Sequence, residues 1–162
     1  MTETGNNAIR REEARLPAEA EESIINTACA GRNGSIWIGT DGAGVFRYQQ
    51  GKFTRMTNGL ASLHVGSLLE DSRTNLWVGT LKGLQYLRGD EFKNVTGPPA
   101  LREVVSSLFE DSKHDLWAST PLALARLTSG GEWRLYGTNA GLDHFYIRGL
   151  AEDREGRLCV AV

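Results

Sequence analysis

The sequence predicts an all-β protein, and three observations carry the prediction. A phrase recurs as "RNGSIWIGT", "SRTNLWVGT" and "KHDLWAST", with its tryptophan at intervals of 40 residues. Each interval holds four apolar runs of strand length, separated by short breaks of turn-forming residues. Glycine is frequent, at 19 of 162 residues, and proline is scarce, at 4. A four-stranded unit with a period of about 40 residues is typical of a β-propeller blade.

The elements are assigned in chain order. Residues 1–22 are polar and charged and form either a tail or, in "NAIRREEARLP" (7–17), the two outer strands of a preceding blade; a charged helix fits this segment equally well. Residues 23–162 hold the propeller repeats, about 3.5 to 4 four-stranded antiparallel blades. We expect these blades at about 23–57, 64–97, 103–137 and, in part, 146–162.

The second repeat shows why these runs are strands of a propeller. Its runs are "HVGSLLED" (64–71), "NLWVGT" (75–80), "GLQYLRG" (83–89) and "EFKNVTG" (91–97), and the short gaps favour antiparallel hairpins. Leu76, Trp77 and Val78 are apolar in succession, which indicates a strand buried on both faces. We therefore expect a structural role for the repeated tryptophans, which would fill the gap to the next blade, while Gly79 leaves room for that neighbour. These tryptophans are Trp37, Trp77 and Trp117.

The repeated aspartates are assigned a structural role as well. Asp71, Asp111 and Asp153 each follow an apolar strand and precede a turn, and the first repeat has Gly31 at this place. A turn aspartate accepts hydrogen bonds from backbone N–H groups two or three residues further on. The alternating acidic residues of a calcium loop are absent from the sequence, so we predict no metal site.

Composition narrows the choice of partners. The net charge is −2 and no basic cluster stands out, which argues against nucleic acid. No apolar run approaches the ~20 residues of a membrane span, so we expect no direct membrane insertion. The N-terminus lacks the apolar segment of a secretory signal, which predicts a cytoplasmic location if the chain is complete. Cys29 and Cys159 are expected to be two buried thiols rather than a disulfide.

Three stretches resemble the two-component regulator propeller repeat: "RNGSIWIGTDGAGVFRYQQGKF", "LLEDSRTNLWVGTLKGLQYLRGDEF" and "LFEDSKHDLWASTPLALARL"; "LAEDREGRLCVAV" matches in part. The resemblance covers about residues 23–162. It implies the sensory propeller of a bacterial histidine kinase or hybrid regulator, placed outside the cytoplasmic membrane, which responds to a ligand, in some members a glycan fragment, or organises dimerisation. We therefore expect a periplasmic or otherwise extracytoplasmic, non-catalytic sensing or interaction module, whose parent protein supplies any kinase activity.

The number of repeats leaves three architectures open. The chain is a piece of a longer propeller, or two copies complete one ring, or four blades close within one monomer. The stop within a strand pattern at Val162 favours the first. The remaining blades or a second copy of the chain are thus the expected protein partners.

Ligand-binding candidates are sought where an outermost strand leads to the next innermost strand, together with the turns on the same face. "DHFYIR" (143–148) is the richest stretch, with aromatic rings for sugar stacking and charges for hydrogen bonding; the alternative for every candidate is a solvated loop side chain. The candidates are Asp41, His64, Lys82, Arg102, Glu103, Asp143, His144, Tyr146 and Arg148.

Catalysis is the less favoured alternative. The sequence has no nucleophile elbow, phosphate-binding loop or metal motif, and we predict no catalytic residue and no cofactor. A propeller lyase or hydrolase that acts on a glycan or small molecule stays open as an alternative, as does a purely structural interaction scaffold. Substrate turnover would distinguish an enzyme from both a sensing module and a structural scaffold.

Overall fold

The computed structural model describes residues 15–142 and 147–162, and it confirms the predicted β-propeller fold. In these residues the strands form three four-stranded antiparallel sheets and one two-stranded sheet, each built from strands consecutive in sequence. The first sheet contains β1 (Ile25–Ala30), β2 (Ile36–Thr40), β3 (Val45–Gln49) and β4 (Lys52–Met56). The second contains β5 (Val65–Glu70), β6 (Leu76–Thr80), β7 (Gly83–Arg88) and β8 (Glu91–Asn94). The third contains β9 (Ser107–Glu110), β10 (Leu116–Ser119), β11 (Leu124–Leu127) and β12 (Trp133–Tyr136), and the fourth contains β13 (Gly149–Glu152) and β14 (Leu158–Ala161).

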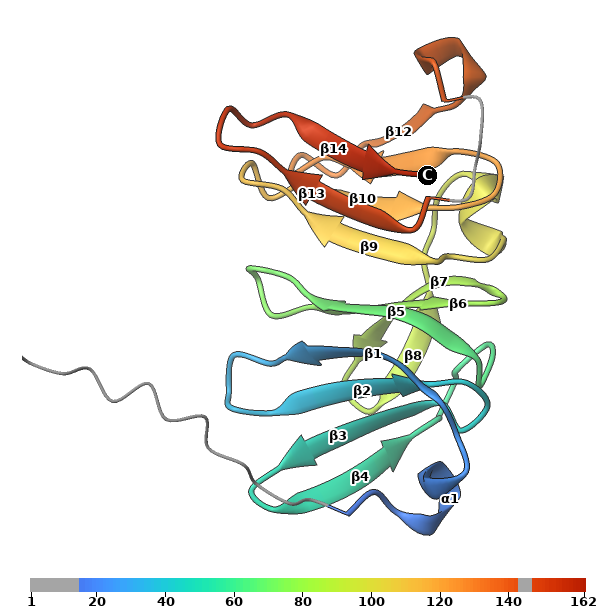
Figure 1. The fold of residues 1–162 in the computed structure, drawn as a ribbon, viewed down its shortest axis with the longest axis vertical. Helices are drawn as coiled ribbons and strands as arrows, with labels where there is room; N and C mark the ends of the chain where they lie inside the picture. The colour runs from blue at the N-terminus through green and yellow to red at the C-terminus, as the bar shows by residue number, and fades with distance from the viewer. Residues whose placement is uncertain (1–14, 143–146) are drawn as a thin grey trace, which may run out of the picture.

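The sheets follow one another as successive blades (Figure 1). Their first strands lie side by side, because β1 packs against β5, β5 against β9, and β9 against β13. The first sheet and the β13–β14 pair lie toward opposite ends of the molecule. The described residues therefore form an open series of blades rather than a closed ring.

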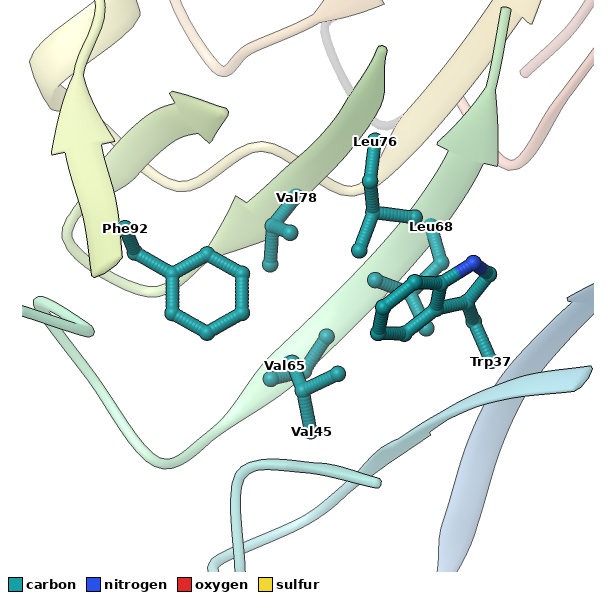
Figure 2. Packing of buried hydrophobic residues seen from close by; sticks show 7 residues of the cluster. All are labelled: Trp37, Val45, Val65, Leu68, Leu76, Val78 and Phe92. Carbon is teal, nitrogen blue, oxygen red and sulfur yellow. The ribbon is translucent and has the colours of Figure 1, made fainter. Parts of the chain in front are cut away.

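The hydrophobic core lies between the sheets. Figure 2 shows the cluster between the first two sheets, in which the Trp37 indole and Val45 meet side chains of the second sheet. The cluster consists of Trp37, Val45, Val65, Leu68, Leu76, Val78 and Phe92. Trp77 packs instead into the next cluster, between the second and third sheets. Successive residues of β6 thus serve opposite faces, which explains why Leu76, Trp77 and Val78 are all apolar.

Gly79 marks a close approach between two sheets. A Cβ atom at this position would lie 2.6 Å from the carbonyl oxygen of Val105 and 2.2 Å from Oγ of Ser67. The third sheet carries Ser119 at the corresponding place, and its hydroxyl lies 2.9 Å from that of Ser106. A serine whose hydroxyl has a hydrogen-bond partner therefore stands in place of the glycine in the third sheet.

The repeated aspartates organise the turns after β5, β9 and β13. Oδ1 of Asp71 accepts hydrogen bonds from the backbone N–H groups of Arg73 (2.9 Å) and Asn75 (2.8 Å). Its Oδ2 accepts a hydrogen bond from Nε1 of Trp77 at 2.8 Å. In the third sheet, Asp111 accepts the corresponding hydrogen bonds from two backbone N–H groups and from the indole of Trp117. Asp153 accepts the backbone bonds too, but Cys159 stands in place of the indole.

The described residues also form three short helices, α1 (Ala18–Glu21) before the first strand and η1 (Pro99–Arg102) and η2 (Thr138–Ala140) in connections between sheets. Ala20 of α1 is fully buried against Ala43 and Phe46 of the first sheet, and Leu16 packs beside it. Residues 15–17 form no strand. The rest of the 7–17 segment lies outside the described residues, so strand, helix and tail all stay open there.

The expectation of two buried thiols is wrong for Cys159. Cys29 is partly buried and Cys159 is exposed, and both are free. Cys159 occupies the tryptophan position of β14, which faces away from the preceding sheet. Burial raises the pKa of the Cys29 thiol, which lies beside the Glu70 carboxylate.

Candidate functional site

The turns between second and third strands and the connections between sheets lie on the same face of the molecule. In each of the three four-stranded sheets, a buried threonine ends or directly follows the second strand and closes the turn, since its hydroxyl donates to a backbone carbonyl three or four residues on. These threonines are Thr40, Thr80 and Thr120, with hydrogen bonds of 2.9, 3.1 and 2.8 Å. The last letter of the repeated "GT" and "ST" is the sequence signal for this turn, and the prediction overlooked it.

A hollow of about 500 Å³ lies on this face, beside the turn that joins β6 to β7. Lys82 reaches it from that turn, and Arg102 reaches it from the end of η1. The remaining lining comes from β7, from the end of β8 and the segment that follows it, and from η1. The lining residues are Lys82, Leu84, Asn94, Val95, Thr96, Gly97, Leu101 and Arg102.

Gly83 brings the two sides of the hollow together. Its φ of +109° is unfavourable for residues with a side chain. A Cβ atom here would lie 2.5 Å from the carbonyl oxygen of Leu101 and 3.0 Å from Cα of Arg102. Glycine therefore allows η1 to lie directly on the β6–β7 turn.

The hollow combines two exposed cations with a lining that presents little apolar surface. Leu84 and Leu101 are buried, at 2% and 3% exposure, whereas the Lys82 and Arg102 side chains are exposed. Neither cation forms an ion pair with any residue in the described part of the chain. Lysine and arginine form charge-assisted hydrogen bonds with carboxylate, sulfate or phosphate groups. The hollow can thus hold a small polar molecule that has an anionic group.

Asp41 and His64 form a second polar group on this face. Nδ1 of His64 lies 2.5 Å from Oδ1 of Asp41, and the two backbones form a β-bridge. Both side chains are about half exposed, at 51% and 47%. The carboxylate orients the imidazole and leaves Nε2 directed elsewhere, an arrangement able to bind a ligand or accept a proton.

The other predicted site residues are not brought together with these two groups. Glu103 follows η1 and is exposed, outside the lining of the hollow. Arg148 is exposed, and its backbone N–H donates to Ala161 at 2.8 Å. Asp143, His144 and Tyr146 lie outside the described residues.

A buried ion pair that the sequence reasoning missed lies near the opposite face. Nε of Arg126 donates to Oδ2 of Asp115 at 2.8 Å, and the guanidinium lies 5.0 Å from the centre of the Trp117 ring. Burial alone would raise the pKa of Asp115, but hydrogen bonds from Arg126 and the Ser129 backbone outweigh it and lower that pKa. The other repeats have Ser35 and Asn75 at the Asp115 place, so the repeat pattern gave no signal for this pair.

No group of three or more metal-binding side chains occurs among the residues that the structure describes. Within the same residues, none of the helices has the length and apolarity needed to span a bilayer.

The comparisons with known proteins agree with the resemblance read from the sequence. Residues 59–82 match the family model described as "Two component regulator propeller". No curated protein matches the chain.

Solved propellers share the fold at low sequence identity. The extracellular domain of a hybrid two component system from B. thetaiotaomicron matches with a TM-score of 0.69 and 19% identity, over 84% of this chain and 18% of its own length. A second such domain matches with a TM-score of 0.72 and 20% identity, and the match covers 92% of this chain and 20% of that domain. Virginiamycin B lyase from Staphylococcus aureus matches with a TM-score of 0.68 and 13% identity, and the match covers 90% of this chain and 50% of the lyase. The chain thus spans about a fifth of the length of the extracellular domains.

Proposed function

The chain carries a two-component regulator propeller repeat, and from this we propose that it is a non-catalytic, ligand-sensing part of a bacterial two-component-type signalling protein. The extracellular domains among its structural neighbours support a location outside the cytoplasmic membrane. Their greater length supports a larger propeller of which this chain forms one part. The kinase or other output belongs to the rest of that protein.

The hollow with Lys82 and Arg102 is the observation that carries this proposal. Its ligand is a small molecule or glycan fragment with an anionic group, which the two exposed cations bind. Lys82 belongs to the second blade, and Arg102 belongs to the connection into the third blade. A ligand that contacts both favours one relative position of the two blades, provided it binds that position more tightly than the alternatives.

Calorimetry with a matched pair of sugars tests this proposal. Digalacturonate and the corresponding neutral digalactose differ in their carboxylates, so the first should bind and the second should bind at least about tenfold more weakly. Lys82→Ala/Arg102→Ala should abolish the preference. Lys113→Ala, an exposed lysine in the turn between β9 and β10, should leave it unchanged. Equal binding of the two sugars, or binding that survives the double substitution, would contradict the assignment of the hollow.

The Asp41–His64 pair favours a second function, a propeller enzyme in which the oriented imidazole accepts a proton. A lyase propeller among the structural neighbours supports this enzymatic alternative to the sensory function. Incubation of the chain with the bound sugar, followed by mass spectrometry, separates the two functions. A sensor leaves the sugar intact, whereas an enzyme yields product that disappears in His64→Ala.

A further inference from the structure

The inner strands β5, β9 and β13 each end in a glutamate that forms hydrogen bonds with the preceding blade. Glu110 of β9 accepts hydrogen bonds from the backbone N–H (2.8 Å) and the hydroxyl (2.5 Å) of Ser72, in the turn of the second sheet. Glu152 of β13 accepts the same two bonds from Ser112, at 2.7 and 2.8 Å. The carboxylates therefore cross the gap between adjacent sheets at the same place in each repeat.

The first junction uses the same carboxylate with different donors. Glu70 of β5 accepts from the backbone N–H of Arg32 at 2.8 Å and from Nε1 of Trp37 at 2.9 Å. A Cβ atom at Gly31 would lie 2.8 Å from Oε2 of Glu70, so glycine makes room for this carboxylate. All three junctions between the described sheets thus contain a glutamate that accepts the N–H of the residue after the aspartate position.

The face of β13–β14 that no described residue covers presents the donor side of this contact. Asp153 shapes its turn as in the other repeats, through bonds from the N–H groups of Glu155 and Arg157 at 2.9 Å each. Arg154 corresponds to Ser72 and Ser112, and its N–H has no acceptor among the described residues. Ala151 and Cys159 are exposed beside it, at the places where Leu69 and Trp77 pack against the third sheet.

The first sheet lacks the matching carboxylate. Ala30 pairs with Ile36 in the register in which Glu70 pairs with Leu76, Glu110 with Leu116 and Glu152 with Leu158. Ala30 is exposed and has no group to accept a hydrogen bond. We call the side of the first sheet that points away from the second sheet its leading face. In a second copy of the chain, this leading face therefore cannot form with β13–β14 the glutamate contact that is present at every described junction.

We propose that the β13–β14 face binds a further propeller blade whose inner strand ends in glutamate, and that Ala30 keeps the first sheet of a second copy from taking this place. The carboxylate accepts the N–H of Arg154 and lies close to a cationic side chain, which strengthens the bond. Apolar side chains of the incoming blade cover Ala151 and Cys159. The face is continuous with the three established junctions, which supports a blade as the occupant.

Conversion of the leading face tests the proposal with the chain as it exists. In sedimentation equilibrium, Ala30→Glu should associate head to tail at least about tenfold more tightly than the unsubstituted chain, because it supplies the missing acceptor. Ala30→Gln, which has the shape without the charge, should gain less. Arg154→Pro removes the N–H donor and should cancel the gain of Ala30→Glu, whereas Arg154→Ala keeps that N–H and should retain most of it.

Circular dichroism of each variant shows that a change in association does not come from unfolding. Self-association of the unsubstituted chain as tight as that of Ala30→Glu would overturn the role of Ala30. A gain that survives Arg154→Pro, or no gain in Ala30→Glu, would overturn the carboxylate contact. These outcomes do not depend on sugar binding, so they are independent of the proposed sensory function.

Discussion

At the scale of single residues, the aspartate turns explain why the repeated phrase contains both an acid and a tryptophan. Asp71 is only 8% exposed, and its carboxylate receives bonds from two backbone N–H groups, the Asn75 amide and the Trp77 indole. One side chain thereby fixes the turn and holds the indole that fills the next gap between sheets. A buried charge is stable in such a place because its oxygens are well supplied with donors.

Asp71→Asn should lower the free energy of unfolding by about 2 kcal/mol, the scale of a hydrogen bond to a charged group. The asparagine keeps one oxygen acceptor but places an NH₂ group against Nε1 of Trp77. Urea unfolding followed by tryptophan fluorescence measures the loss. Trp77→Phe removes the indole donor and keeps the carboxylate, so Asp71→Asn should cost clearly less in the Trp77→Phe background than in the unsubstituted chain. Equal losses in the two backgrounds would show that the indole bond contributes nothing.

The same carboxylate predicts the response to acid. Burial alone would raise the pKa of Asp71, but hydrogen bonds from Trp77, Asn75 and Arg73 outweigh it and lower that pKa below the ordinary 3.8. The unfolded chain then binds the proton more readily, so stability rises with pH in this range. The contribution is complete above pH 3.8 and is lost as the pH falls through the lower folded value. The free energy of unfolding, measured by urea unfolding at several pH values between 5 and 2, should therefore change less with pH in Asp71→Asn than in the unsubstituted chain.

Close packing at Gly79 leads to a second prediction at this scale. Gly79→Ala should destabilise the chain by about 1–3 kcal/mol, because the added methyl meets the backbone oxygen of Val105. Gly149→Ala is a suitable control in another strand, since its Cβ would make only an ordinary 3.8 Å contact with Ala161. Thermal unfolding should separate the two variants. Similar melting temperatures would mean that the second and third sheets can move apart at little cost.

At the scale of the elements, the period of the sequence was enough to predict the strands. Four apolar runs per 40 residues gave the four-stranded sheets, and the three apolar residues of β6 correctly indicated burial on both faces. The short helices were missed because η1 and α1 are each one turn long and depend on packing that the local sequence does not encode. The hollow was foreseen only as single residues, since Lys82 and Arg102 meet through the close approach at Gly83.

Gly83 therefore connects an element to the candidate function. Gly83→Ala introduces a side chain at a φ of +109° and against the Leu101 carbonyl, so η1 should move away from the turn. Binding of an acidic sugar in the hollow should weaken at least about tenfold in calorimetry. Gly89→Ala carries a similar backbone cost, at a φ of +66°, but its Cβ has no neighbour within 4 Å. Unchanged affinity in Gly89→Ala together with a loss in Gly83→Ala would attribute the effect to η1.

At the scale of the whole molecule, stability should vary along the series of sheets. Among the described strands, the main contacts between sheets join neighbouring sheets, as in other repeat proteins, so the protection of a sheet depends on how many neighbours it has. β5 lies between β1 and β9, whereas the β13–β14 pair has a described sheet, the third, on one side only. Local opening should therefore cost least in the β13–β14 pair.

Hydrogen exchange measured by mass spectrometry should show this gradient, with slowest exchange in β5 and β6 and fastest strand exchange in β13 and β14. Trp117→Ala should accelerate exchange in β13 and β14, because the indole packs against Leu150, Leu158 and Val160. β1 and β2 should keep their protection, because two junctions separate them from the substitution. Uniform acceleration in all four sheets would mean that the series unfolds as a single cooperative unit. In that case a ligand held between the second and third blades would stabilise the whole chain rather than shift one junction.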